Sequence, residues 1–158
     1  MTTITLFHGS PHEEVTPAFG LGNDKHDYGR GFYLTESVGL AKEWAVCRPD
    51  ESNGWVHRYE LDLEDLRILD FQQHNVLAWL AELMKHRSAA DSKRYRMLAA
   101  KFIEAYGIDT SGYDVIAVAP YSSVLNTLVT LLASESMRRR MFARASISLR
   151  LYFSLNSS

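Results

Sequence analysis

The chain has 158 residues, 46% of them hydrophobic and 23% charged, which is enough for one domain with a normal core and excludes a disordered chain. The formal net charge is −2, and residues 1–114 carry no basic stripe that would predict nucleic-acid binding. No apolar run has the length of a membrane span, and the single cysteine, Cys47, excludes an intramolecular disulfide. We therefore expect a cytoplasmic protein without membrane contact. The six histidines lack metal-ligand spacing, so no metal site is expected.

The first third of the chain predicts two strands separated by a glycine turn. Ile4–Phe7 is a short apolar run rich in β-forming residues, and it delivers His8 at its end. Gly29 and Gly31 let the backbone bend and approach a ligand closely. They lead into an aromatic strand at Phe32–Leu34, whose alternate side chains point to opposite faces. We expect one of these aromatic side chains to pack in the core and the other to face a cleft.

The remaining elements predict a single domain of the α+β class. A helix after the second strand has Thr35 or Ser37 as its N-cap, and Trp44 is expected to pack it on the sheet. Strands are expected at Trp55–Leu61 and Tyr113–Val118, an extended piece at Leu66–Phe71, and helices at about His74–His86 and Asp91–Tyr106. The predicted buried face of the helix at 74–86 consists of Leu77, Leu80, Ala81 and Met84.

Residues 118–158 form an atypical tail. From Val115 onward there is no lysine or aspartate, but there are nine serines and five arginines. Enrichment in Ser, Arg and Leu is typical of out-of-frame translation, so one hypothesis is that a frameshift near residue 117 replaced the native C-terminus. The alternative is divergence, in which Ile147–Phe153 forms a strand of the same domain. Leu131–Ser136 reads as a helix.

Three motifs occur in order along the chain. Phe7-His8-Gly9-Ser10 is followed by Asp27-Tyr28-Gly29-Arg30-Gly31-Phe32-Tyr33-Leu34-Thr35 and then by Ala41-Lys42-Glu43-Trp44-Ala45. This pattern resembles the ADP-ribosyltransferase superfamily, most closely the poly-ADP-ribose polymerase type, and within it an uncharacterised bacterial family of unknown function. The resemblance covers roughly residues 4–117. It implies an α+β fold with a mixed sheet and flanking helices. In this fold, residues 1–117 would be the ADP-ribosyltransferase-like NAD-binding region, and the tail 118–158 would complete the same domain.

The resemblance implies a role for each motif residue in an NAD site. His8 and Tyr33 would be catalytic, with His8 hydrogen-bonded to a ribose hydroxyl of NAD and Tyr33 lining the nicotinamide pocket. Gly9 would offer its backbone to the nicotinamide carboxamide, and Tyr28 would stack on the ring. The resemblance implies two further NAD contacts, Ser10 and Arg30, although the sequence around Arg30 favours a solvated loop charge over a phosphate ligand.

The third catalytic position of the superfamily, a late carboxylate or amide, has no clear counterpart. After Asp114 the only acid is Glu135, in the stretch that reads as a helix. Two functions therefore stay open. One is an NAD-dependent ADP-ribosyltransferase-like enzyme, related to toxins or effectors, with an unknown macromolecular acceptor and an antitoxin-like partner. The other is a catalytically inactive, truncated or frameshifted relative that acts as an NAD-binding or protein-interaction module.

Overall fold

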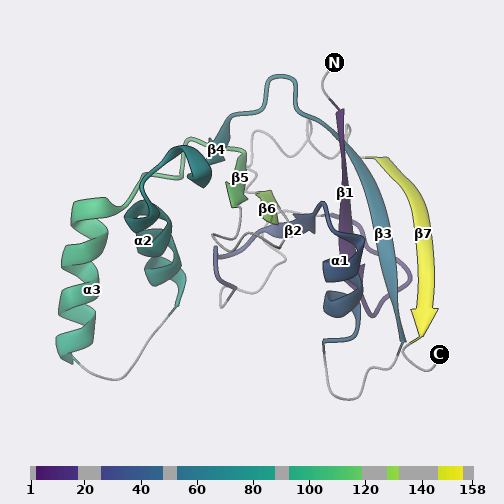
Figure 1. Cartoon of the computed structure of the whole chain (residues 1–158), viewed down its shortest axis with the longest axis horizontal. Coiled ribbons are helices and arrows are strands. Elements are labelled where there is room, and N and C mark those ends of the chain that lie inside the picture. Colours follow the sequence, from purple (N-terminus) through teal and green to yellow (C-terminus); the bar gives the residue numbers. More distant parts are fainter. Residues whose placement is uncertain are drawn as a thin grey trace.

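A computed structural model describes residues 3–17, 26–47, 53–87, 93–118, 128–131 and 146–154. Within them, seven strands form one sheet in the order β4-β5-β6-β2-β1-β3-β7 (Figure 1). The strands are β1 Thr3–Ser10, β2 Phe32–Thr35, β3 Asn53–Asp62, β4 Ile68–Asp70, β5 Val115–Val118, β6 Leu128–Leu131 and β7 Ser146–Ser154. The helices are α1 Val38–Ala45, the short 3₁₀-helix η1 Phe71–Gln73, α2 Val76–His86 and α3 Lys93–Tyr106.

The sheet is mixed, and the fold is α+β as the sequence predicts. β4 and β5 run parallel, and every other neighbouring pair is antiparallel. The longest ladders join β3 to β1, from Thr3↔Asp62 to Ser10↔Trp55, and β3 to β7 at the edge. Burial tends to alternate along β3, because successive side chains of a strand point to opposite faces of the sheet.

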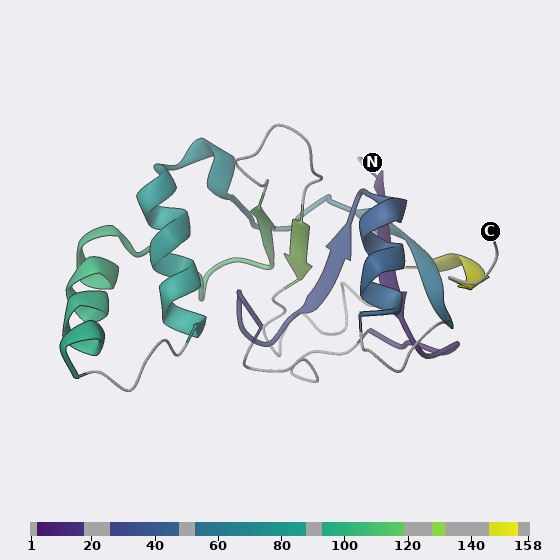
Figure 2. The same ribbon diagram turned by 60° about the horizontal axis from the view of Figure 1, so that its bottom comes forward.

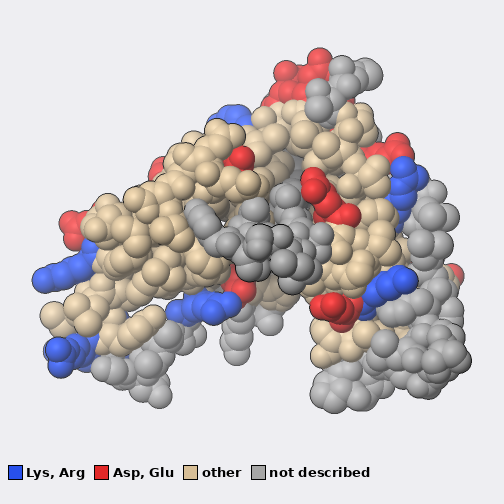
Figure 3. Space-filling model, in the orientation of Figure 1, with Lys and Arg blue, Asp and Glu red and all other residues tan. Residues whose placement is uncertain are grey.

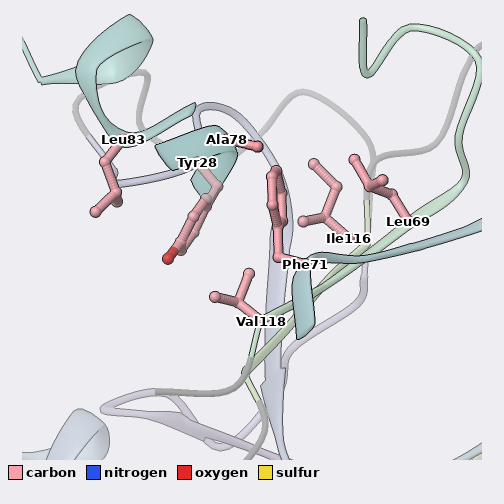
Figure 4. Packing of buried hydrophobic residues seen from close by; sticks show 7 residues of the cluster. All are labelled: Tyr28, Leu69, Phe71, Ala78, Leu83, Ile116 and Val118. Atoms are coloured by element: carbon pink, nitrogen blue, oxygen red, sulfur yellow. The ribbon is translucent and has the colours of Figure 1, made fainter. Parts of the chain in front are cut away.

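Each face of the sheet has its own apolar core. One cluster consists of Leu6, Leu34, Tyr59, Leu61 and Val115. The other lies on the opposite face, because its members from β5 alternate with Val115 along the strand. Figure 4 shows this second cluster, in which residues of the glycine turn, β4, β5 and α2 meet: Tyr28, Leu69, Phe71, Ala78, Leu83, Ile116 and Val118.

Helix α1 packs directly on β1 and β3, as the rotated view makes clear (Figure 2). The Ser37 hydroxyl accepts a hydrogen bond from Leu40 N at 3.2 Å, so Ser37 rather than Thr35 is the N-cap of the two that the sequence allowed. Close packing depends on two glycines of the sheet. A Cβ at Gly9 would collide with the carbonyl oxygen of Ala41, and one at Gly54 would lie 2.6 Å from the Ala45 Cβ. Trp44, expected in the core, is only half-buried.

Helices α2 and α3 form an arm beside the β4–β5 end of the sheet (Figure 1). The predicted buried face of α2 is wrong in part: Ala81 is buried, but Leu80 is 39% exposed and Glu82 is 1% exposed. The face shifts because α2 packs against the second cluster through Ala78 and also contacts α3. Helix α3, the outer helix of this arm, carries four exposed basic residues, and Figure 3 shows Lys and Arg side chains in this region. They are Lys93, Arg94, Arg96 and Lys101.

The tail contributes two strands to the sheet. β7 confirms the strand expected at Ile147–Phe153, and it pairs with β3 from Asn53↔Ser154 onward. β6 pairs with both β2 and β5, so it lies in the middle of the sheet. The helix expected at Leu131–Ser136 is wrong at Leu131, which belongs to β6, and residues 132–136 lie outside the described part. The reading frame of the tail stays a prediction.

Candidate functional site

The strands β1 and β2 separate beside the His-Gly-Ser motif. β1 pairs with β3 over its full length, whereas its pairing with β2 is the single residue pair Phe7↔Thr35. Continued pairing would bring Gly9 opposite Tyr33. Instead the His8 side chain bridges the two strands, because its Nδ1 lies 2.8 Å from the Tyr33 carbonyl oxygen. We call this place, between His8–Ser10 of β1 and Phe32–Tyr33 of β2, the β1–β2 fork.

The hydrogen bond to Tyr33 fixes the tautomer of His8. A carbonyl oxygen can only accept, so the Nδ1 of His8 carries the proton and its Nε2 has a free lone pair. Burial lowers the pKa of His8 from its ordinary value of 6.5 to about 4; the Tyr33 carbonyl raises it, and nearby His57 lowers it. His8 is therefore neutral near pH 7, with Nε2 as a hydrogen-bond acceptor.

Two further rings surround His8. The Phe32 ring centroid lies 4.5 Å from that of His8, with 30° between the planes. The His57 ring lies 6.4 Å away, on the residue paired with His8 across β1 and β3. His57 is fully buried, and its Nε2 donates to the His12 carbonyl at 3.1 Å. His8 therefore lies against aromatic side chains rather than in open solvent.

Tyr33 leaves β2 on the opposite face from His8. The strand alternation puts Phe32 and Leu34 on the His8 face and Tyr33 against the second cluster. The Tyr33 hydroxyl donates to the Gly29 carbonyl at 2.8 Å and accepts from the Tyr28 N–H at 3.2 Å. Burial raises the pKa of Tyr33 to about 12, so the hydroxyl keeps its proton. The structure thus brings His8 to the Tyr33 backbone and not to its ring.

Tyr28 lies in the core, 5% exposed, with its hydroxyl accepting from the Trp79 Nε1 at 2.8 Å. Stacking on a nicotinamide ring would require this side chain to leave the second cluster, so that role stays a prediction. Gly29 next to it has φ of 76°, in the left-handed region that favours glycine. Burial raises the pKa of Tyr28 as well.

Gly9 and Ser10 lie at the fork, and Arg30 lies on the surface. Gly9 is buried under α1, and its backbone is part of the ladder with Val56 of β3. The buried Ser10 hydroxyl accepts from the His12 N–H at 3.1 Å, which closes the turn after β1. Arg30 is exposed. Their predicted NAD contacts stay predictions.

Sequence reasoning missed Phe32 and His57 as neighbours of His8. Alternation shows that Phe32 and Tyr33 face opposite ways, but it does not tell which of them shares a face with His8. That depends on the β1–β2 register, which the chain between the two strands leaves unspecified. Glu135, the only candidate for the third catalytic position, lies outside the described residues. Among the described residues, no group of three or more His, Cys, Asp or Glu side chains is arranged to hold a metal ion.

Comparison with known proteins identifies a family. A family model described as "Protein of unknown function (DUF3990)" matches residues 4–150, which includes most of the tail. No curated protein matches the chain. No helix in the described ranges combines the length and apolarity needed to cross a membrane.

Proposed function

The chain belongs to this DUF3990 family, and we propose that it is an ADP-ribosyltransferase-like protein that binds NAD and transfers ADP-ribose to a macromolecular acceptor. The proposal starts from the resemblance of the His-Gly-Ser and Gly-Arg-Gly-Phe-Tyr-Leu-Thr motifs to that superfamily. It is supported by the meeting of the two motifs at the β1–β2 fork.

The observation that carries the proposal is the neutral His8 at the fork. Its Nδ1 proton is held by the Tyr33 carbonyl, which leaves the Nε2 lone pair available to accept a hydrogen bond from a ligand. A ribose hydroxyl is a donor that suits this atom. A positively charged imidazole would offer only donors there and would also repel the cationic nicotinamide ring.

The residues of the fork fit part of an NAD site. His8 would hold the nicotinamide ribose through Nε2, and the Gly9 backbone would hold the carboxamide. Phe32, rather than Tyr33, is the aromatic side chain beside His8. Bound NAD supplies the ADP-ribose group and the bond to nicotinamide that transfer breaks. The carboxylate that stabilises the positive charge on the ribose or activates the acceptor would come from the tail, where Glu135 is the remaining candidate.

NAD binding and nicotinamide release by the purified full chain test the proposal. Titration calorimetry would measure binding, and chromatography would measure release. His8→Asn is the sharp variant, since an Asn amide can still donate to the Tyr33 carbonyl but offers no acceptor at the position of Nε2. We expect it to weaken NAD binding and to abolish release, whereas His74→Asn, at an exposed histidine, leaves both unchanged.

The outcomes separate the functions that the sequence left open. Binding with release, both dependent on His8, supports the transferase. Binding without release supports the inactive NAD-binding relative, and no binding by the unaltered chain overturns both. If the protein is a toxin or effector, its expression should arrest growth, and His8→Ala should relieve that arrest. A partner protein that restrains the activity would then be identified by its ability to block nicotinamide release.

A further inference from the structure

Helix α2 holds the glycine turn, residues 26–31, at three points. The Arg87 guanidinium binds the Asp27 carboxylate through two hydrogen bonds, of 2.8 Å from Nε and 2.9 Å from Nη2. Trp79 donates its indole N–H to the Tyr28 hydroxyl. The third point is steric: a Cβ at Gly29 would lie 2.7 Å from Cε1 of the His86 ring. The turn is thus fitted to one side of α2, both by charge and by shape.

The His86 ring is itself fixed by a buried carboxylate. Glu82 is 1% exposed, and its Oε1 accepts from the His86 Nε2 at 3.0 Å. Its other oxygen accepts from the Lys85 ammonium at 2.7 Å, and Lys85 also donates to the Ile108 carbonyl at 2.6 Å. A buried carboxylate is costly unless it is paired, and here both oxygens are. This network holds the His86 ring against Gly29.

A continuous chain of contacts leads from the turn to His8. The Tyr33 hydroxyl bonds the two backbone groups of the turn, the Gly29 carbonyl and the Tyr28 N–H. At its other end, the Tyr33 carbonyl accepts the Nδ1 proton of His8. Displacement of the turn would therefore move Tyr33, and the hydrogen bond that selects the His8 tautomer would weaken.

We propose that Trp79 and His86 of α2, together with Arg87 at its C-cap, are positioning residues, which hold the glycine turn and thereby keep Nε2 of His8 unprotonated as the acceptor at the β1–β2 fork. The importance of Nε2 for NAD rests on the proposed function. The positioning itself is a property of the fold and can be measured without NAD. None of the three side chains needs to touch the ligand.

The test uses Arg87→Ala, Asp27→Ala and the exchanged pair Asp27→Arg with Arg87→Asp in the full chain. Arg94→Ala, at an exposed arginine of α3, is the matched control. The ¹⁵N chemical shifts of the His8 ring report its tautomer, and amide hydrogen exchange reports the opening of residues 26–31. NAD affinity is measured in parallel.

The Arg87–Asp27 pair is about half exposed, so we expect Arg87→Ala and Asp27→Ala to speed exchange in the turn about two- to fivefold and to introduce the Nε2-protonated tautomer of His8. The exchanged pair should restore both, and Arg94→Ala should change neither. NAD affinity should fall about fivefold in the single variants and recover in the exchanged pair. Unchanged exchange and tautomer in Arg87→Ala would overturn the proposal. If the unaltered chain binds no NAD while the tautomer still responds to Arg87, the proposed function fails and the positioning role stands.

Discussion

Replacement of Tyr33 by Phe should destabilise the protein without disturbing its packing, because only the hydroxyl is lost. That hydroxyl donates to the Gly29 carbonyl at 2.8 Å and accepts from the Tyr28 N–H at 3.2 Å, and both residues are buried. A buried polar group left without its partner costs about 1–3 kcal/mol. The middle of this range predicts a loss of about 2 kcal/mol in the free energy of unfolding. For a chain of this size that corresponds to a melting temperature lower by about 4–8 °C.

Urea unfolding followed by tryptophan fluorescence would measure the change in stability, with equal slopes for the two proteins. Tyr95→Phe, at a tyrosine of α3 that is 37% exposed, is the control and should stay within about 0.5 kcal/mol of the unaltered chain. Equal midpoints for Tyr33→Phe and the control would refute the reasoning, because the hydroxyl would then have no part in holding the glycine turn.

Three further predictions concern α1, His8 and the tail. Gly9→Ala should lower the free energy of unfolding by about 2 kcal/mol or more, because the new Cβ would collide with the Ala41 carbonyl. Gly39→Ala, at an open position on α1, should raise the free energy of unfolding slightly. Thermal melts of the two variants check both expectations. Between about pH 4 and 6.5, His8 is protonated in the unfolded chain but not in the folded chain, so the free energy of unfolding should rise with pH. Unfolding measured across this pH range should show a smaller rise for His8→Asn than for the unaltered chain. Deletion of residues 119–158 removes the central strand β6 and should abolish cooperative unfolding, whereas deletion of 146–158 removes only the edge strand β7 and should lower the midpoint. A cooperative melt of the chain that lacks 119–158 would contradict the place of β6 in the sheet.

The local signals in the sequence predicted most elements of the fold. Alternation located β3, glycine and aromatic residues located the turn and β2, and Ser37 marked the start of α1. These signals depend on neighbours in the chain, and the sequence contains them in full. The buried face of α2 was predicted less well, because a polar residue, Glu82, takes a core position once Lys85 and His86 satisfy its carboxylate. The i+3 and i+4 spacing of those partners was visible in the sequence. The burial of Glu82 was not, because it depends on distant segments: the glycine turn against His86 and the Ile108 carbonyl that binds Lys85.

The candidate site was harder to predict for the same reason. The motifs indicated that His8 and the second strand would meet, and they do, through the Tyr33 carbonyl. They did not indicate that Phe32 would share the His8 face or that the Tyr33 and Tyr28 hydroxyls would be used to hold the turn. Which of two adjacent side chains faces a ligand depends on register between strands, and register depends on contacts between distant parts of the chain.

The sheet order ties the question of the tail to the question of function. β4, β5 and the α2–α3 arm lie on one side of β6, and β2, β1 and β3 lie on the other. The two sides are joined by β6, by the packing of Val115 in the first cluster and by the contacts of α2 with the glycine turn, and these links together hold α2 in place relative to His8. A tail translated in a foreign frame would have to supply a central strand by chance. The reading frame of the tail stays a prediction, but β6 pairs with both β2 and β5, so this strand of the tail helps to hold the candidate site together.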